Sequence, residues 1–326
     1  MPFPNSMQTP IGTTIMDDAS HDFGGEWTEL KLETISAYSK FFVGAIGRLF
    51  DLWYVDPFAG TGQRTATEWS GGLFEAEPIS QIEREYPGSA ARALGQIPPF
   101  THLRLGDSSR KHYKALTKLR DLYPDRDVEV VHGDANKFIQ TFFSQSAWTS
   151  DDFSYGTSRA LVFLDPYGME VKWETLRVLA KSRKADVWFL ANMKAATQQL
   201  SHSHDGLDDN KRNALCEYFG TDGWEERFYL PSQGQGLLGM MESRRRSADR
   251  REIAAFHREC LKTLFAYVSD PLPLKVGAID DYFLLYCMSN NPSPKAQGLI
   301  AKGATHVIKK YKSASRYRSA LQGGDQ

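Results

Sequence analysis

The sequence contains little cysteine and no long apolar run. Its three cysteines, Cys216, Cys260 and Cys287, are far apart and odd in number, which argues against a disulfide framework and against a thiol metal site. No stretch approaches the roughly 20 apolar residues of a membrane helix, and the N-terminus lacks the basic start and apolar run of a signal peptide. We therefore expect a soluble, cytoplasmic protein with reduced thiols, no bound metal and no membrane contact.

The chain also lacks an excess of either charge, with 39 Lys and Arg against 40 Asp and Glu. Net charge therefore gives no argument for or against nucleic acid. The distribution is uneven, because residues 291–326 carry seven Lys or Arg and one acid. A basic patch of this kind binds phosphates or is simply a solvated helix face, and both interpretations stay open. The candidate phosphate or substrate contacts are Arg244, Arg245, Arg246, Lys309 and Lys310.

Apolar periodicity divides the chain into alternating strands and helices. Leu52 to Val55, Ala160 to Leu164 and Val187 to Ala191 are short, continuous apolar runs, which are typical of strands buried on both faces. Helical spacing separates them, as from Trp27 to Leu49. We expect an α/β fold with a doubly wound, mostly parallel, Rossmann-like sheet, and a smaller, mainly helical C-terminal appendage.

The same pattern suggests where the parts of the chain begin and end. Residues 1–25 are rich in Pro, Ser, Thr and Gly and are expected to form a flexible arm. Residues 26–196 hold the cofactor-binding domain. Residues 197–270 are expected to be an insertion of helices and loops that contacts a substrate or a partner. Residues 271–326 supply the final strand of the core and a basic C-terminal helix.

A glycine loop follows the first predicted strand, with the sequence Asp-Pro-Phe-Ala-Gly-Thr-Gly over residues 56–62. Glycines there let a ligand approach the main chain closely. The third glycine of the dinucleotide motif is replaced by Thr65, and an acid opens the loop, which favours an amine-bearing cofactor such as S-adenosylmethionine over a pyrophosphate. The alternative is a tight βα turn that binds no ligand. The predicted cofactor contacts are Asp56, Phe58, Ala59, Gly60, Thr61 and Gly62.

Further polar residues follow the next two strands. Ligands of open α/β sheets bind outside the carboxyl ends of the strands. Asp107, two residues past the second strand, is a candidate for the ribose hydroxyls, and Asp134, at the end of the third, for the adenine amino group. Asn136 is a weaker neighbour of Asp134. For each acid the alternative is a helix N-cap, a position that favours Asp.

The second prominent motif is Asp165-Pro166-Tyr167-Gly168, at the end of an apolar strand. It resembles the Asp-Pro-Pro-Tyr of enzymes that methylate the adenine amino group, although the second proline is missing. It also resembles the Asp-Pro-Phe-Gly of tRNA guanine-N2 methyltransferases. Both resemblances imply that Asp165 and Pro166 orient an exocyclic amine while the Tyr167 ring stacks on the base. The alternative is a strand-end turn with a packed tyrosine.

The order of motifs along residues 26–312 resembles the three-Cys-motif partner family, TcmP. The matching elements are Trp27-Thr28-x-x-Lys31-Leu32, the glycine loop, Gly133-Asp134-x-Asn136, residues 163–168 and Tyr282-x-Leu284-x-Tyr286. The family is methyltransferase-like, and its name implies a separate partner protein with a three-cysteine motif. Leu105-Gly106-Asp107 departs from the family pattern, in which the acid stands directly at the strand end.

Three functions follow from these observations. We expect first an S-adenosylmethionine-dependent methyltransferase that modifies a nucleobase amine in DNA or RNA. The second hypothesis is a catalytically silent, methyltransferase-like protein that acts as a partner of the three-Cys-motif enzyme. The third, an NAD-dependent oxidoreductase, is disfavoured by the missing third glycine.

Overall fold

The computed structural model describes residues 25–70, 80–236 and 239–322. Nearly all of the predicted arm, residues 1–25, lies outside them. The centre of the fold is an eight-stranded sheet in which seven strands run in the order β10-β12-β7-β6-β1-β4-β5, and β11 pairs with β12. The strands are β1 (Asp51–Asp56), β4 (His102–Asp107), β5 (Asp127–His132), β6 (Ser158–Leu164), β7 (Ala185–Asn192), β10 (Tyr267–Val268), β11 (Leu272–Val276) and β12 (Ile279–Ser289).

Most pairs in this sheet are parallel. Strands β5, β4, β1, β6 and β7 pair in parallel with their neighbours, whereas β12 runs antiparallel to β7. Because β1 lies between β4 and β6, the chain winds outward from it in both directions, so the carboxyl end of β1 is the topological switch point. The predicted doubly wound, mostly parallel sheet is confirmed.

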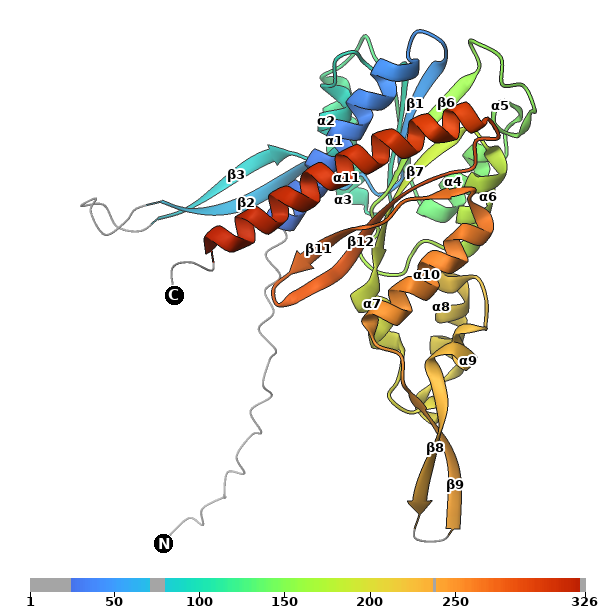
Figure 1. Ribbon diagram of the computed structural model, residues 1–326. Coiled ribbons are helices and arrows are strands. Elements are labelled where there is room, and N and C mark those ends of the chain that lie inside the picture. Colours follow the sequence, from blue (N-terminus) through green and yellow to red (C-terminus); the bar gives the residue numbers. More distant parts are fainter. Residues whose placement is uncertain (1–24, 71–79, 237–238, 323–326) are drawn as a thin grey trace, which may run out of the picture.

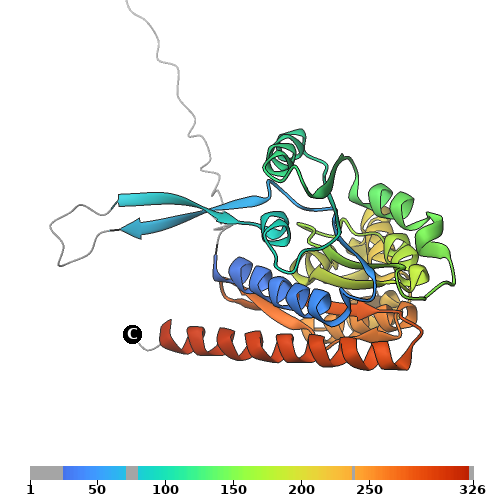
Figure 2. The ribbon, with the colours of Figure 1, turned by 90° about the horizontal axis from the view of Figure 1, so that it is seen from above.

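Helices cover both faces of the sheet (Figures 1 and 2). The long helices α1 and α11 pack against each other on one face, where α2 and α3 join them in one hydrophobic cluster. Helices α4, α6, α7, α8 and α10 contribute to the cluster on the other face. Their bounds are α1 (Glu26–Ile46), α2 (Ser89–Leu94), α3 (Arg110–Asp121), α4 (Ala135–Phe143), α6 (Trp173–Ser182), α7 (Met193–Gln199), α8 (Asp209–Phe219), α10 (Arg250–Leu264) and α11 (Pro294–Gln322).

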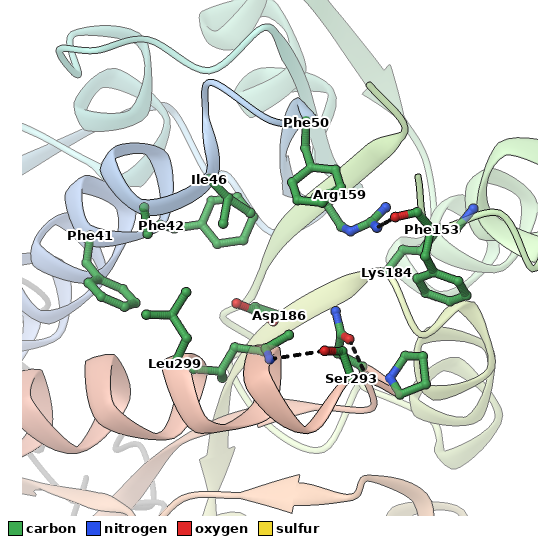
Figure 3. Close-up of a pocket in the computed structure, with 15 residues that line it drawn as sticks. Phe41, Phe42, Ile46, Phe50, Phe153, Arg159, Lys184, Asp186, Ser293 and Leu299 are labelled. Atoms are coloured by element: carbon green, nitrogen blue, oxygen red, sulfur yellow. Dashed lines mark hydrogen bonds between the residues drawn. The ribbon is translucent and has the colours of Figure 1, made fainter. Parts of the chain in front are cut away.

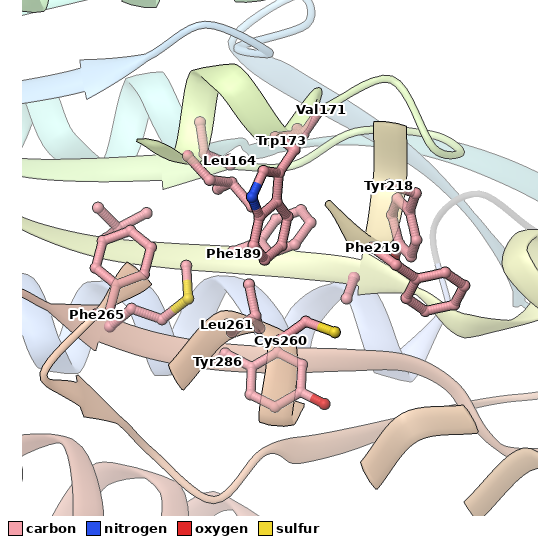
Figure 4. Close-up of a cluster of buried hydrophobic side chains, with 14 of the residues drawn as sticks. Leu164, Val171, Trp173, Phe189, Tyr218, Phe219, Cys260, Leu261, Phe265 and Tyr286 are labelled. Atoms are coloured by element: carbon pink, nitrogen blue, oxygen red, sulfur yellow. The ribbon is translucent and has the colours of Figure 1, made fainter. Parts of the chain in front are cut away.

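The central strands read as continuous apolar runs because each supplies side chains to both clusters. In β7, Trp188 and Leu190 pack toward α1, while Val187 and Phe189 pack toward α6 and α10. Figure 4 shows the cluster on the α6 and α10 side, which includes Trp173, Phe189 and Tyr286. Burying apolar area on both faces is the main stabilising contribution in such a sheet.

Several elements were not predicted. A hairpin of β2 (Gln63–Ser70) and β3 (Ser80–Pro87) stands between the glycine loop and α2, and Figure 1 shows it extending away from the body. A glycine loop of this kind usually leads directly into a helix. Strand β11 contains Pro273, a residue that normally argues against a strand. Proline is tolerated there because β11 pairs only with β12, at the margin of the sheet.

The region of residues 197–270, predicted as an insertion of helices and loops, also contains a β-hairpin. It holds α8, α9 (Trp224–Phe228), a hairpin of β8 (Tyr229–Gly236) and β9 (Gly239–Arg246), and α10. Helix α8 was not predicted, because it buries only Leu215, Tyr218 and Phe219, which are too few for a clear apolar stripe. The remaining short helices are α5 (Ser146–Thr149) and a 3₁₀ turn at His204–Gly206. Within the described residues, none of the helices is both long and apolar enough to cross a membrane.

Candidate functional site

A cavity of about 500 Å³ opens at the carboxyl end of β1, at the switch point of the sheet. Its walls come from the start of α1, the glycine loop, the start of α2, the segment after β6 and the β11–β12 hairpin. The volume lies within the roughly 300 to 1,000 Å³ of small-molecule sites. The predicted residues that line it are Phe58, Ala59, Gly60, Thr61, Asp165, Pro166 and Tyr167.

The glycine loop holds its shape through backbone hydrogen bonds. The Ala59 N–H donates to the Gly106 carbonyl at 2.9 Å, and the Gly60 N–H donates to Asp107 Oδ2 at 3.1 Å. Gly60 and Gly62 have φ of 59° and 75°, a region that side chains disfavour. A Cβ on Gly60 would meet nothing within 4 Å, whereas one on Gly62 would lie 2.5 Å from Leu119 Cδ2. Gly60 therefore leaves open space beside the main chain, and Gly62 allows α3 to pack.

Asp56 lies beneath the cavity and is not part of its lining. Its side chain is fully buried and accepts hydrogen bonds from Ser89 Oγ at 2.6 Å, the Phe58 N–H at 3.1 Å and the Tyr54 hydroxyl at 3.4 Å. Burial raises the pKa of Asp56 to about 7, and the nearby Asp165 adds to the shift, while the bond from Ser89 opposes it. Asp56 therefore holds the loop and α2 together, and Ser89 is the group that reaches the cavity.

The three polar residues predicted after β4 and β5 have different positions. Asp107 accepts the Gly60 N–H, and its Oδ2 lies 3.1 Å from His112 Nδ1, a side chain that lines the cavity. Asp134 is exposed and caps α4 by accepting a hydrogen bond from the Lys137 N–H at 2.8 Å. Of the two alternatives predicted for Asp134, the structure therefore shows the helix N-cap. It lines a separate hollow beside β5. Of the two acids, only Asp107 adjoins the cavity.

Asn136 points into the interior and not toward the cavity. Its Nδ2 donates to the Glu170 carbonyl at 2.8 Å, and its Oδ1 accepts from the Lys172 N–H at 2.9 Å and from Thr175 Oγ1 at 2.8 Å. Asn136 thus ties the segment after Asp165-Pro166-Tyr167 to α4. Asn136 was predicted as a cofactor contact, and in the structure it positions the segment that follows Tyr167.

The principal electrostatic feature of the cavity is an ion pair between Lys31 and Asp165. Lys31 Nζ donates to both carboxylate oxygens, at 2.8 and 2.7 Å, and the two side chains are 7% and 19% exposed. The ammonium also lies 4.9 Å from the Trp27 ring centroid. Lys31 was not predicted as a site residue. The available signal was its place on the buried face of α1, four and seven residues before Ile35 and Tyr38.

Tyr167 lies at the rim of the cavity and is 65% exposed. Its carbonyl accepts a hydrogen bond from Asn192 Nδ2 at 2.7 Å, so Asn192, at the end of β7, fixes the backbone beside the ring. Trp27 and Phe283 stack with centroids 4.9 Å apart and form another part of the lining. The predicted Asp165, Pro166 and Tyr167 thus share one cavity with aromatic side chains that the sequence analysis did not select.

The candidate phosphate contacts do not form one surface. Arg244 donates to the carbonyls of Glu225 and Tyr229, and Arg246 to those of Thr197 and Leu200, which makes both structural. Arg245 is exposed on β9, whereas Lys309 and Lys310 are exposed on α11. Figure 1 shows the β8–β9 hairpin and α11 at different sides of the molecule.

Comparisons with known proteins give structural likenesses only. No protein-family model and no curated protein sequence matches the chain. A Legionella pneumophila protein has a TM-score of 0.46 at 13% identity, covering 87% of this chain and 94% of its own. An S-adenosylmethionine-dependent methyltransferase from Clostridium acetobutylicum has a TM-score of 0.33 at 13% identity, covering 78% and 91%. Plantazolicin methyltransferase, in complex with SAH, has 0.33 at 11% identity, covering 83% and 88%. Scores this low carry no argument about activity.

Proposed function

We propose that this protein is an S-adenosylmethionine-dependent methyltransferase that methylates an exocyclic amine of a nucleobase in DNA or RNA. The observation that carries the proposal is that the Lys31–Asp165 pair and Tyr167 share one cavity with the glycine loop at the switch point. An acid, an aromatic ring and an accessible main chain are the groups that hold a base beside an amine-bearing cofactor.

The residues of the loop fit this cofactor better than a dinucleotide. Gly60 leaves space beside the main chain, and Ser89 and His112 offer polar groups in the same cavity. The position of the third glycine in the dinucleotide motif is occupied by Thr65, which lies in β2 and not in a helix packed on the sheet. For these reasons we disfavour an NAD-dependent oxidoreductase.

In the proposed reaction the protein contributes positioning and electrostatics. When bound, S-adenosylmethionine supplies a methyl group that the amine nitrogen takes with its lone pair, while sulfur keeps the C–S electrons and the amine proton leaves to solvent. Asp165 has about four lone-pair sites, so it accepts a hydrogen bond from the amine while it remains paired with Lys31. Lys31 holds the carboxylate in place, and Tyr167 stacks on the base.

Nucleic acid contact is assigned to exposed basic residues only. Arg245, Lys309 and Lys310 are exposed and are retained as candidate phosphate contacts. Arg244 and Arg246 already donate to backbone carbonyls. If these cations bind phosphates, loss of one of them weakens the binding of every nucleic-acid sequence alike and lowers the salt dependence of that binding.

A catalytically silent partner of a three-Cys-motif enzyme is the second candidate. The observation that favours it is again the ion pair, because Lys31 already engages both oxygens of Asp165. A protein that retains the cavity only for binding has no need of a free carboxylate.

Binding and transfer experiments separate these functions. We expect calorimetry to detect S-adenosylmethionine and not NAD, and labelled methyl groups to pass from the cofactor to an RNA or DNA pool. Asp165→Asn is expected to abolish transfer and to retain cofactor binding, whereas the control Asp125→Asn, at an exposed position, changes neither. Cofactor binding without transfer to any pool would favour the silent partner. Transfer that persists in Asp165→Asn would contradict the role of Asp165.

A further inference from the structure

A second cavity, of about 430 Å³, lies at the opposite end of the sheet from the candidate site. It is enclosed by the last turns of α1, the first turns of α11 and the amino ends of β6 and β7 (Figure 3). Its volume is also within the range of small-molecule sites. None of the functions proposed above uses it.

The cavity has an apolar end and a basic end. Phe41, Phe42 and Leu299 gather at one end in Figure 3, and Arg159 and Lys184 lie at the other, beside Phe153. The Arg159 guanidinium carbon is 5.3 Å and the Lys184 ammonium 5.4 Å from the Phe153 ring centroid. An occupant that matches both ends is amphipathic, with one charged group.

The two cations at the basic end are buried, and the acids that act on them do so from beyond salt-bridge distance. Arg159 is 5% and Lys184 2% exposed. Throughout the described ranges, no carboxylate oxygen lies within 4.0 Å of either. Buried charges are normally paired, because desolvation of an isolated ion is costly. Two buried cations in one cavity wall, neither in contact with a carboxylate, therefore favour an anionic occupant.

Neutral oxygens satisfy only part of the donor capacity of these cations. Arg159 donates to Thr157 Oγ1, the Ser158 carbonyl and the Phe153 carbonyl, which uses three of the five guanidinium N–H groups. Lys184 Nζ likewise donates to the Ala147 carbonyl and Ser150 Oγ, both at 2.8 Å, and has three protons. These bonds fix the positions of the cations and leave donors for one small acceptor group.

Asp186 is the acid in the lining of this cavity, and it acts on Arg159 without forming a salt bridge with it. Its Oδ2 accepts a hydrogen bond from the Tyr38 hydroxyl at 2.8 Å, and burial raises its pKa to about 6. Asp152, an exposed acid outside the lining, also acts on Arg159 and Lys184, and like Asp186 it makes no salt bridge with either. Among the described residues, a carboxylate in direct contact with these cations would therefore come from the occupant.

We propose that this cavity binds a small monocarboxylate with an apolar body, its carboxylate at Arg159 and Lys184 and its apolar part between α1 and α11. A carboxylate suits the fork of donors on a guanidinium. The apolar walls supply affinity through burial of the hydrocarbon part. The inference concerns a separate site and is independent of the proposed methyl transfer.

The test compares three eight-carbon probes by calorimetry on the full chain at pH 7.5, namely octanoate, 1-octanol and octylamine. We expect octanoate to bind at least about tenfold more tightly than 1-octanol, the ratio that one charge-assisted hydrogen bond gives. Octylamine is expected to bind more weakly than 1-octanol. Equal affinities for octanoate and 1-octanol, tighter binding of octylamine, or absence of octanoate binding would each overturn the proposal.

Two variants locate the binding. Arg159→Gln is expected to reduce the preference for octanoate over 1-octanol to about twofold. Because loss of a buried arginine also threatens folding, Ala296→Phe serves as a second variant, which fills the cavity and leaves both cations in place. It is expected to lower octanoate affinity at least about tenfold, whereas Lys295→Gln, an exposed position outside the cavity, leaves it unchanged. Unchanged octanoate affinity in Ala296→Phe would overturn the assignment.

Discussion

Replacement of Lys31 by methionine is the most direct probe of the candidate site. Methionine keeps a long side chain against Trp27 and removes the charge, so it leaves the Asp165 carboxylate without its ammonium partner. Breaking a fully buried ion pair costs about 3–5 kcal/mol. The Asp165 side chain is 19% exposed and regains some hydration, so we expect Lys31→Met to lower the free energy of unfolding by about 2–3 kcal/mol.

The assay is a double-mutant cycle measured by urea unfolding at pH 7. The four proteins are the wild type, Lys31→Met, Asp165→Asn and the double variant. Residues in direct contact couple, and for this pair we expect a coupling energy of about 1–2 kcal/mol. The control is the surface pair of Glu174 and Arg177, whose side chains are 50% and 46% exposed. Its cycle is expected to give about 0.5 kcal/mol or less.

The reasoning fails if the two cycles give the same coupling energy, or if Lys31→Met unfolds at the wild-type midpoint. Either result would mean that the ammonium and the carboxylate of this pair are effectively solvated. The same variants then enter the methyl-transfer assay, in which both Lys31→Met and Asp165→Asn are expected to lose activity. Retained activity in Lys31→Met would leave Lys31 without a positioning role.

Three further variants test the loop and its support. The pKa of Asp56 is raised to about 7, so its ionisation lowers the free energy of unfolding as the pH rises from about 4 through 7. In unfolding experiments at pH 5 and pH 8, we expect Asp56→Asn to gain stability relative to the wild type at the higher pH. A difference that does not change with pH would refute this. At Gly62 a φ of 75° is combined with a contact at 2.5 Å for an added Cβ. By denaturant unfolding, we therefore expect Gly62→Ala to lower the free energy of unfolding by about 2–3 kcal/mol and Gly60→Ala to lower it by about 1 kcal/mol. The reverse order would contradict the packing argument. Asn136→Ala leaves buried groups unpaired and is expected to cost about 2 kcal/mol in the same assay; a cost below 0.5 kcal/mol would count against it.

The central sheet was predictable because its strands are buried on both faces. Continuous apolar runs such as Ala160 to Leu164 are typical of a strand that is covered by helices on both faces of the sheet. The inserted β2–β3 hairpin and α8 were not predictable in the same way, since neither shows a strong apolar period. Their formation depends on surroundings that a single sequence does not display.

The candidate site was predictable where residues cluster in a motif and not where they meet across the fold. Asp165 and Tyr167 followed from one local sequence, and both line the cavity. Lys31 lies 134 positions away from Asp165, and no local pattern connects them. Asp56 shows the converse, because the glycine-loop motif does not reveal that its carboxylate turns inward to Ser89.

Helix α1 connects the two cavities of the molecule. Its first turns carry Trp27 and Lys31 to the candidate site, and its last turns carry Phe42 and Ile46 to the second cavity. At 1.5 Å per residue its 21 residues span roughly 30 Å as one rod. If a ligand at one end changes the affinity at the other by some factor, thermodynamic linkage requires the same factor in the reverse direction. One affinity measured with and without the other ligand therefore yields the coupling for both.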